Sequence, residues 1–296
     1  MRFLTRVLQV ARLGTGLLTL ALAVPVPAAC AEDFAVPRPS PGAKVQQTVG
    51  TTDLSISYSR PGVKGRVIWG ALVPYDKPWR TGANDATQFT CTNDVSVEGQ
   101  KLAAGTYAID TVPTPDRWTV AFWNLTPPLG ALDYDPKYDV LRVTVKPVTS
   151  EMTERLQFTF DDPTADAVTL DLRWEKLSVP IRLTVDTNGK TLAAARAALA
   201  VAKPDDWRTP YRAASWAFDA GVVPDETTKW AQAAGKVKQN FQTCGLLARL
   251  AARSGDTKLA TALMKQSIAF GKADTTVAAA QVEGNEKTLA EWTAKK

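Results

Sequence analysis

Histidine is absent from all 296 residues of this sequence, and its absence excludes several kinds of active site. A serine–histidine–aspartate triad and a cysteine–histidine pair both need an imidazole as general base. Zinc sites built on imidazole ligands are excluded for the same reason. Any general base in this chain would therefore have to be a carboxylate, a lysine or a tyrosine.

Cysteine is also scarce, with three residues in the chain: Cys30, Cys91 and Cys244. An oxidising compartment would permit a disulfide between Cys91 and Cys244. These two residues fall in segments of different predicted structure, one on a strand and one on a helix, and free cysteine behaves as a small apolar residue in a core. We expect two separate buried thiols, and a disulfide joining the two segments is the alternative.

Residues 1–31 have the pattern of a secretory signal peptide. A positive region with three arginines precedes an apolar stretch at about residues 17–26, and Ala29-Cys30-Ala31 fits the small-x-small cleavage rule. We expect cleavage after Ala31 and a periplasmic or secreted bacterial protein. A lipid anchor on Cys30 is the alternative, although the leucine usual three residues before an acylated cysteine is missing.

Positive charge is modest once the signal is removed. The signal holds three arginines and no acid, so cleavage lowers the formal net charge from +5 to +2. This charge gives no reason to expect nucleic acid as a partner. Because no later segment is apolar enough to cross a bilayer, we expect no integral membrane segment after cleavage.

An alternating pattern of apolar and polar residues dominates the first half of the mature chain. Residues 32–43 are rich in proline and small residues and are expected to form a flexible leader. Residues 44–186 then contain about eight or nine short alternating runs separated by turn residues, as half-buried antiparallel strands require. We predict an antiparallel β-sandwich, or an open barrel, over 44–186.

Residues 187–296 are rich in alanine and change to helical periodicity. The predicted helix ends are marked by Pro204, Gly221, Gly255 and Asp256. The segment 240–273 is expected to form two packed helices, similar to a tetratricopeptide hairpin. Since no sequence repeat of about 34 residues is visible, a helical bundle is the alternative. We expect these helices to pack on one another by default, and a protein partner is the sharper hypothesis.

Four segments carry a resemblance to a known family: YSRPGVKGRVIWGALVPYDKPWRTGANDAT, DVSVEGQKLAAGTYAIDTVP, RWTVAFW and YDPKYDVLRVTVKP. Over about Lys44 to Val185, the chain resembles the exported bacterial family catalogued as domain of unknown function 2911. The resemblance implies a mostly β domain, an exported address and often a helical tail. It implies no established activity, so no catalytic residue is carried over. The proline-rich segment NLTPPLGALDYDP departs from the expected pattern, which implies a different ligand if that loop borders a site.

Cations, aromatic residues and glycines are concentrated between residues 58 and 85. Glycine-rich loops can direct successive N–H groups at an anion, and arginine can bind a carboxylate or phosphate through two hydrogen bonds. We therefore hypothesise a site for an anionic small molecule or acidic glycan. The candidate ligand-binding residues are Arg60, Lys64, Arg66, Trp79, Arg80, Asn84 and Asp85.

An internal clamp explains the same residues and is the favoured interpretation. An irregular loop needs partners for its own backbone carbonyls, and arginines donate to several carbonyls at once and stack on tryptophans. The two interpretations are compatible, because a rigid loop can also present a ligand contact.

Two further candidates rest on aspartates. Asp133, Asp135 and Asp139 offer the oxygen ligands that calcium uses, but their spacing lacks the glycine and terminal glutamate of an EF-hand loop. We expect a solvated loop there, with no metal site and no cofactor. Asp76 and Asp85 are conceivable members of a glycosidase acid–base pair.

The sequence thus favours an exported, non-catalytic binding or scaffold protein. The alternative is a carboxylate-dependent hydrolase that acts on glycans or another cell-envelope polymer. The absence of histidine excludes hydrolases that depend on an imidazole. A hydrolase that uses carboxylates as both acid and base is still compatible with the sequence.

Overall fold

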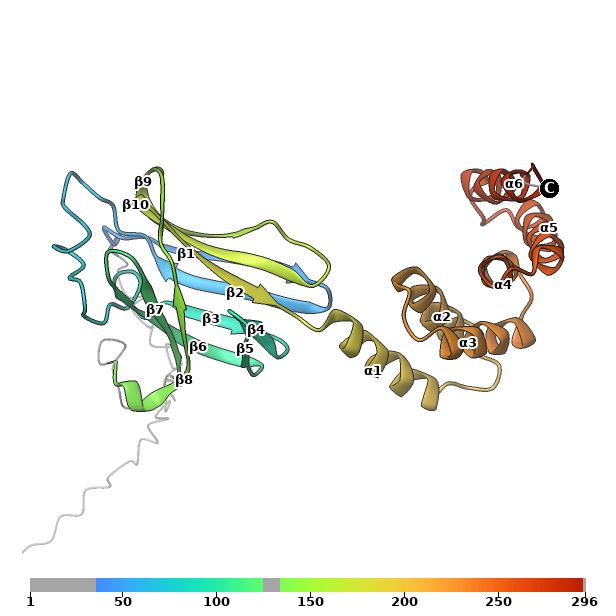
Figure 1. The fold of residues 1–296 in the computed structure, drawn as a ribbon, viewed down its shortest axis with the longest axis horizontal. Coiled ribbons are helices and arrows are strands. Elements are labelled where there is room, and N and C mark those ends of the chain that lie inside the picture. The colour runs from blue at the N-terminus through green and yellow to red at the C-terminus, as the bar shows by residue number, and fades with distance from the viewer. Residues whose placement is uncertain (1–35, 125–133, 295–296) are drawn as a thin grey trace, which may run out of the picture. The chain divides into compact units, whose positions relative to one another are not determined.

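The computed structural model describes residues 36–124 and 134–294, and these residues form ten strands followed by six α-helices (Figure 1). The order confirms the predicted change from β to α structure. The predicted signal peptide, the lipid-anchor candidate Cys30 and most of the proline-rich segment lie outside the described residues.

Ten strands make up the β-domain. They are β1 (Gly42–Val49), β2 (Thr52–Ser59), β3 (Gln88–Cys91), β4 (Val95–Val97), β5 (Gln100–Leu102), β6 (Gly105–Pro113), β7 (Trp118–Trp123), β8 (Asp139–Val145), β9 (Val148–Asp161) and β10 (Ala167–Thr184). A short 3-10 helix, η1 (Pro136–Tyr138), precedes β8.

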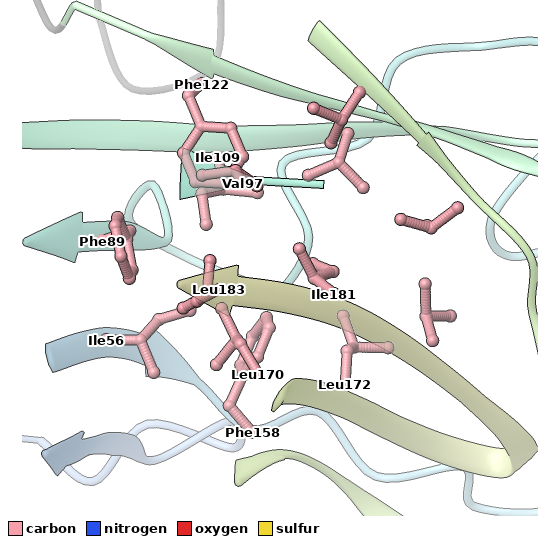
Figure 2. Close-up of a cluster of buried hydrophobic side chains, with 14 of the residues drawn as sticks. Ile56, Phe89, Val97, Ile109, Phe122, Phe158, Leu170, Leu172, Ile181 and Leu183 are labelled. Carbon is pink, nitrogen blue, oxygen red and sulfur yellow. The ribbon is translucent and has the colours of Figure 1, made fainter. Parts of the chain in front are cut away.

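The strands form two separate antiparallel sheets, which identifies a sandwich rather than a barrel. The six-stranded sheet has the order β1-β2-β3-β6-β7-β8, and the four-stranded sheet has the order β5-β4-β10-β9. Between them, large side chains from both inner faces meet in one core (Figure 2). Phe89, Ile109 and Phe122 come from the six-stranded sheet, and Phe158 and Leu172 come from the four-stranded sheet.

One strand is longer than the sequence pattern indicates. The alternating runs that end at Trp174 and begin at Val179 belong to the single strand β10. Between them Glu175 has a positive φ of 56°, and the register with β9 shifts on either side of it. Such bulges interrupt the alternation without ending the strand, which is why the sequence suggests two strands.

Six helices follow the β-domain. They are α1 (Thr187–Ala200), α2 (Arg208–Ala220), α3 (Pro224–Val237), α4 (Phe241–Arg253), α5 (Thr257–Ala273) and α6 (Ala279–Ala294). Two predicted boundary residues act as expected. Gly221 ends α2 with a φ of 69°, and the Asp256 side chain accepts a hydrogen bond from the Leu259 amide at the start of α5.

A structural repeat links the two helix pairs α2–α3 and α4–α5. The first helices begin at Arg208 and Phe241 and the second helices at Pro224 and Thr257, so both offsets are 33 residues. Buried positions recur at the same offset: Thr227 with Ala260, Ala231 with Met264, Ala234 with Ser267, and Gly235 with Ile268. None of these pairs is identical, which explains why the sequence shows no repeat. The arrangement is that of two helix pairs repeated at an offset of 33 residues.

Cys91 on β3 and Cys244 on α4 are both buried and form no disulfide, which confirms the prediction of two separate thiols. Burial raises the pKa of both thiols. A raised pKa disfavours the reactive thiolate, so both cysteines behave as core residues. No helix among residues 36–124 and 134–294 is long and apolar enough to span a membrane.

Candidate functional site

The basic loop between β2 and β3 is tied to both sheets. Near its start, the Val63 amide donates to the Glu154 carbonyl on β9 at 2.8 Å. Near its end, Trp79 and Thr111 exchange two backbone hydrogen bonds of 2.8 Å each, which join the loop to β6. Backbone bonds at both ends hold the loop in one path across the edge of the sandwich.

Arg60 and Arg66 donate to backbone carbonyls within the β-domain. Arg60 Nε donates to the Leu156 carbonyl at 3.0 Å, and Arg66 Nε donates to the Val63 carbonyl at 3.1 Å. A second nitrogen of Arg66 donates to the Gly62 carbonyl. These contacts are those of the internal clamp, because they attach the two guanidinium groups to carbonyls of the loop and of β9.

Trp79 lies in a cluster of four tryptophans with Trp69, Trp118 and Trp174. It stacks on Trp174, with ring centroids 5.9 Å apart and an interplanar angle of 19°, and Trp69 meets the other three edge-on. The Trp79 indole N–H also donates to the Gly82 carbonyl at 3.2 Å. The four rings fix the loop to the core, so Trp79 is placed as an anchor.

The remaining candidates have different positions along the loop. The Asn84 side chain donates to the Ser40 carbonyl at 2.9 Å and to Ser59 Oγ at 3.2 Å, which holds the N-terminal segment beside β2. Lys64 and Asp85 are exposed. The Lys64 amide donates to Glu154 Oε1 at 3.0 Å, so this hydrogen bond involves the backbone of Lys64 and not its ammonium group.

Arg80 differs from the other arginines of the loop. It follows the Trp79–Thr111 bridge, so the antiparallel pairing places it opposite Asp110 on β6. The side chain is half-buried, and its buried Nε meets no hydrogen-bond acceptor in the described part of the chain. A buried guanidinium N–H without an acceptor is costly, and that cost requires an explanation.

Asp110 is the functional candidate that the sequence reading missed. It is 4% exposed, and its Oδ1 accepts a hydrogen bond from the Trp123 indole N–H at 2.9 Å. Burial raises the pKa of the Asp110 carboxyl, Trp123 and Arg80 oppose that rise, and Asp139 adds to it. The available signal was an acidic residue in the middle of the otherwise uncharged run GTYAIDTVP.

Asp139, at the start of β8, pairs with Trp123 on β7. It therefore lies on the outer face of the six-stranded sheet, the face that points away from the other sheet. Its Oδ2 accepts a hydrogen bond from the Tyr134 hydroxyl at 3.0 Å and forms an ion pair with Arg142. Tyr134 packs edge-on against Trp123, with centroids 5.9 Å apart. Burial, reinforced by Asp139, raises the pKa of the Tyr134 hydroxyl to about 12, so this group stays a neutral donor.

A register shift brings Asp139 to this face. Phe122 pairs with Leu141, but Trp123 pairs with Asp139, so Val140 is an extra residue in β8. In an unbroken ladder Val140 would oppose Trp123, and alternation would turn Asp139 to the core side. The polar cluster of Arg80, Asp110, Trp123, Tyr134, Asp139 and Arg142 therefore depends on a bulge.

The predicted arginine site is thus divided by the structure. Arg60 and Arg66 contact their own backbone surroundings, whereas Arg80 joins the polar cluster. Asp133, one of the three weighed as calcium ligands, lies outside the described residues, and Asp135 and Asp139 form ion pairs with Lys137 and Arg142. Among the described residues, no group of three or more cysteines, aspartates and glutamates is arranged to hold a metal ion.

Comparison with known proteins gives one match. No curated protein and no solved structure matches the chain. Residues 40–183 match the family model described as "Protein of unknown function (DUF2911)". The match begins just before β1 and ends one residue before the end of β10, and it includes neither the helices nor residues 1–39. The β-sandwich of this chain is thus the part that matches the DUF2911 family model.

Proposed function

We propose that this chain is an exported binding or scaffold protein whose β-domain binds an anionic small molecule or acidic glycan at Arg80. The observation that carries the proposal is the buried Arg80 Nε, which no acceptor of the described chain satisfies. An oxygen of an anionic ligand would supply that acceptor.

The neighbouring arginines give the contrast that makes Arg80 the centre of the site. Arg60 Nε and Arg66 Nε both have carbonyl acceptors at about 3 Å. The Nε atoms of Arg60 and Arg66 thus donate to backbone carbonyls of the β-domain. The Nε atom of Arg80 has no such acceptor among the described residues. A rigid loop with a guanidinium Nε that lacks an acceptor suits ligand binding, because this donor is held in place before the ligand arrives.

A thermal-shift screen of acidic sugars, dicarboxylates and phosphates tests the proposal. At a ligand concentration of about 100 Kd, the free energy of unfolding should rise by about 2.7 kcal/mol. Replacement Arg80→Gln should abolish the shift and leave the melting curve of the free protein nearly unchanged. Replacement Arg60→Gln is the matched control: it should lower the melting temperature of the free protein and preserve the ligand-induced shift.

Two results would overturn this proposal. One is the absence of a shift with every anion of the screen. The other is an Arg80→Gln variant that responds to the anions as the unmodified protein does, since binding would then lie elsewhere.

A carboxylate-dependent hydrolase of glycans is the second candidate, and the polar cluster is the observation that favours it. Burial raises the pKa of Asp110, as a general acid requires, while Asp139 is held in an ion pair with Arg142. Release of reducing ends from cell-envelope polysaccharide would be measured for the unmodified protein, Asp110→Asn and Asp139→Asn. Exposed Asp116→Asn is the control. Activity that survives in Asp110→Asn and Asp139→Asn, or is absent in the unmodified protein, contradicts this candidate.

A further inference from the structure

The outer face of the six-stranded sheet has a row of residues with a small side chain in its middle. Asp110 on β6 pairs with Ala121 on β7, and Ala121 pairs with Arg142 on β8. Directly paired residues of neighbouring strands point to the same face of a sheet. Only the methyl group of Ala121 therefore stands between Asp110 and Arg142. Arg80 lies on the side of Asp110 that faces away from Ala121.

Asp139 combines a neutralised charge with an unused hydrogen-bonding position. Its Oδ2 is engaged by the Tyr134 hydroxyl and the Arg142 guanidinium. Its Oδ1 is buried and meets no donor within residues 36–124 and 134–294. Because Arg142 already balances the carboxylate charge, what Oδ1 lacks is a neutral donor rather than a second cation.

Two buried atoms of opposite hydrogen-bonding type thus border Asp110. Arg80 Nε is a donor without an acceptor, and Asp139 Oδ1 is an acceptor without a donor. Both side chains lie close enough to Asp110 to act on its charge, one favouring its ionised form and the other opposing it. A simple anion satisfies only Arg80, and a neutral hydroxyl compound lacks the charge that Arg80 prefers. A carboxylate that also carries a hydroxyl group satisfies both atoms.

We propose that the ligand bound at Arg80 is a hydroxy acid, of which acidic sugars are one class, and that Asp139 is the specificity-determining residue that accepts the hydroxyl hydrogen. This inference rests on the proposed function, since it names the ligand class for the same site. It extends that function by assigning a second contact on a different strand from the basic loop.

The test compares matched ligands by titration calorimetry on the mature protein. Glutarate, 2-hydroxyglutarate and glutamate share one carbon skeleton and carry a hydrogen, a hydroxyl or an ammonium group on the same carbon. Glucuronate and glucose form a second pair that differs in the carboxylate. We expect 2-hydroxyglutarate to bind at least about tenfold more tightly than glutarate and glutamate, and glucuronate to bind at least about tenfold more tightly than glucose.

The variants locate the source of the preference. Asp139→Ala should remove the tenfold preference for the hydroxyl compound while leaving glutarate binding within about twofold. Tyr134→Phe deletes a hydroxyl that donates to Oδ2 and accepts from Arg142 but leaves Oδ1 unchanged, so it should retain the preference and is the matched control. If Asp139→Ala does not fold, the comparison of 2-hydroxyglutarate with glutarate on the unmodified protein still decides between the two ligand classes.

The failures of the two proposals are distinguishable. If glutarate or glutamate binds as tightly as 2-hydroxyglutarate and Arg80→Gln abolishes that binding, the hydroxy-acid inference is wrong and the anion site stands. A preference that persists in Asp139→Ala removes Asp139 from the site. If no carboxylate binds at all, the inference and the proposed function fall together. Equal binding of glucuronate and glucose also contradicts both.

Discussion

The β-domain and the helical region bury very different side chains. The core of the β-domain contains large residues such as Phe89, Phe122 and Trp118, each 1% exposed or less. The buried positions of the helices are mainly alanine, glycine, serine and threonine, with small clusters around Met264 and Leu246. One region is stabilised by filling the space between two sheets, and the other by the close approach of helices along small side chains.

The two regions also differ in their buried polar groups. Among the described residues, the β-domain buries the carboxylates of Asp110 and Asp171, whereas the helices bury only the hydroxyl residues Thr227, Thr243 and Ser267. Asp171 is held by Ser178 and Arg173, a fully bonded arrangement. The comparison teaches that the buried carboxylates of the described residues lie in the β-domain, whereas the ion pairs of the helices are at the surface.

The largest expected effect is the loss of a core aromatic side chain from the β-domain. Phe122→Ala should lower the free energy of unfolding by about 3–5 kcal/mol, because the sheets cannot close around the cavity. Phe270→Ala on α5, where the ring is 39% exposed, is the control and should cost no more than about 1 kcal/mol. Denaturant unfolding measures both, and equal losses would contradict the contrast between the regions.

The converse substitution tests the helical region. Ala248 on α4 is fully buried, so Ala248→Leu should cost about 1–3 kcal/mol by forcing the helices apart. Ala193→Leu on α1 places the same side chain at an exposed position and should change the free energy of unfolding by no more than about 0.5 kcal/mol. If Ala248→Leu is tolerated as well as Ala193→Leu, close packing does not stabilise these helices.

A smaller effect separates the tryptophans of the loop cluster. Trp79→Phe removes an indole N–H that donates to the Gly82 carbonyl, whereas Trp69→Phe removes one that meets no acceptor among the described residues. Both changes delete the same volume, so Trp79→Phe should be the more destabilising by about 1 kcal/mol. Thermal unfolding of the two variants measures the difference, and a reversed order would show that the clamp does not depend on this bond.

The last expected effect concerns pH dependence rather than stability at one pH. Burial raises the pKa of Asp110 in the folded protein. The protonated carboxyl group therefore makes its full contribution to the free energy of unfolding below the ordinary aspartate pKa of about 4. That stabilisation is lost as pH rises through the raised pKa. The unmodified protein should therefore lose stability relative to Asp110→Asn as pH increases. Urea unfolding between about pH 3 and pH 8 measures this slope, with Asp116→Asn as the exposed control; parallel curves for the unmodified protein and Asp110→Asn would refute it.

Alternation and helix-end residues made the fold predictable from the sequence. Strands such as β7 and β8 show a clean apolar face, and Gly221 and Asp256 mark helix ends through local chemistry. The length of β10 was not predictable, because the positive φ at Glu175 belongs to a residue type that rarely adopts it. The helical repeat was missed because only burial recurs at its positions, while residue identity differs at each and side-chain size differs between Gly235 and Ile268.

The candidate site was predictable only in part. Arg80 was named from its position in the basic loop, yet nothing in the sequence separates it from Arg60, since the difference lies in which carbonyls come within reach after folding. Asp110 and Asp139 are 29 positions apart and meet only through the pairing of β6, β7 and β8. Cross-strand neighbours of this kind depend on register, which short alternating runs leave undetermined.

The extra residue at the start of β8 has a consequence for how such a face can change. Where a strand keeps strict alternation, each side chain is assigned to the interior or to the exterior by parity alone. A single insertion reverses that parity locally, and here it transfers a carboxylate from the apolar interior to a wall of polar groups. The membership of the polar cluster is therefore set by one local shift of register at the start of β8, while the pairing of β7 with β8 from Trp118–Val145 to Phe122–Leu141 is unbroken.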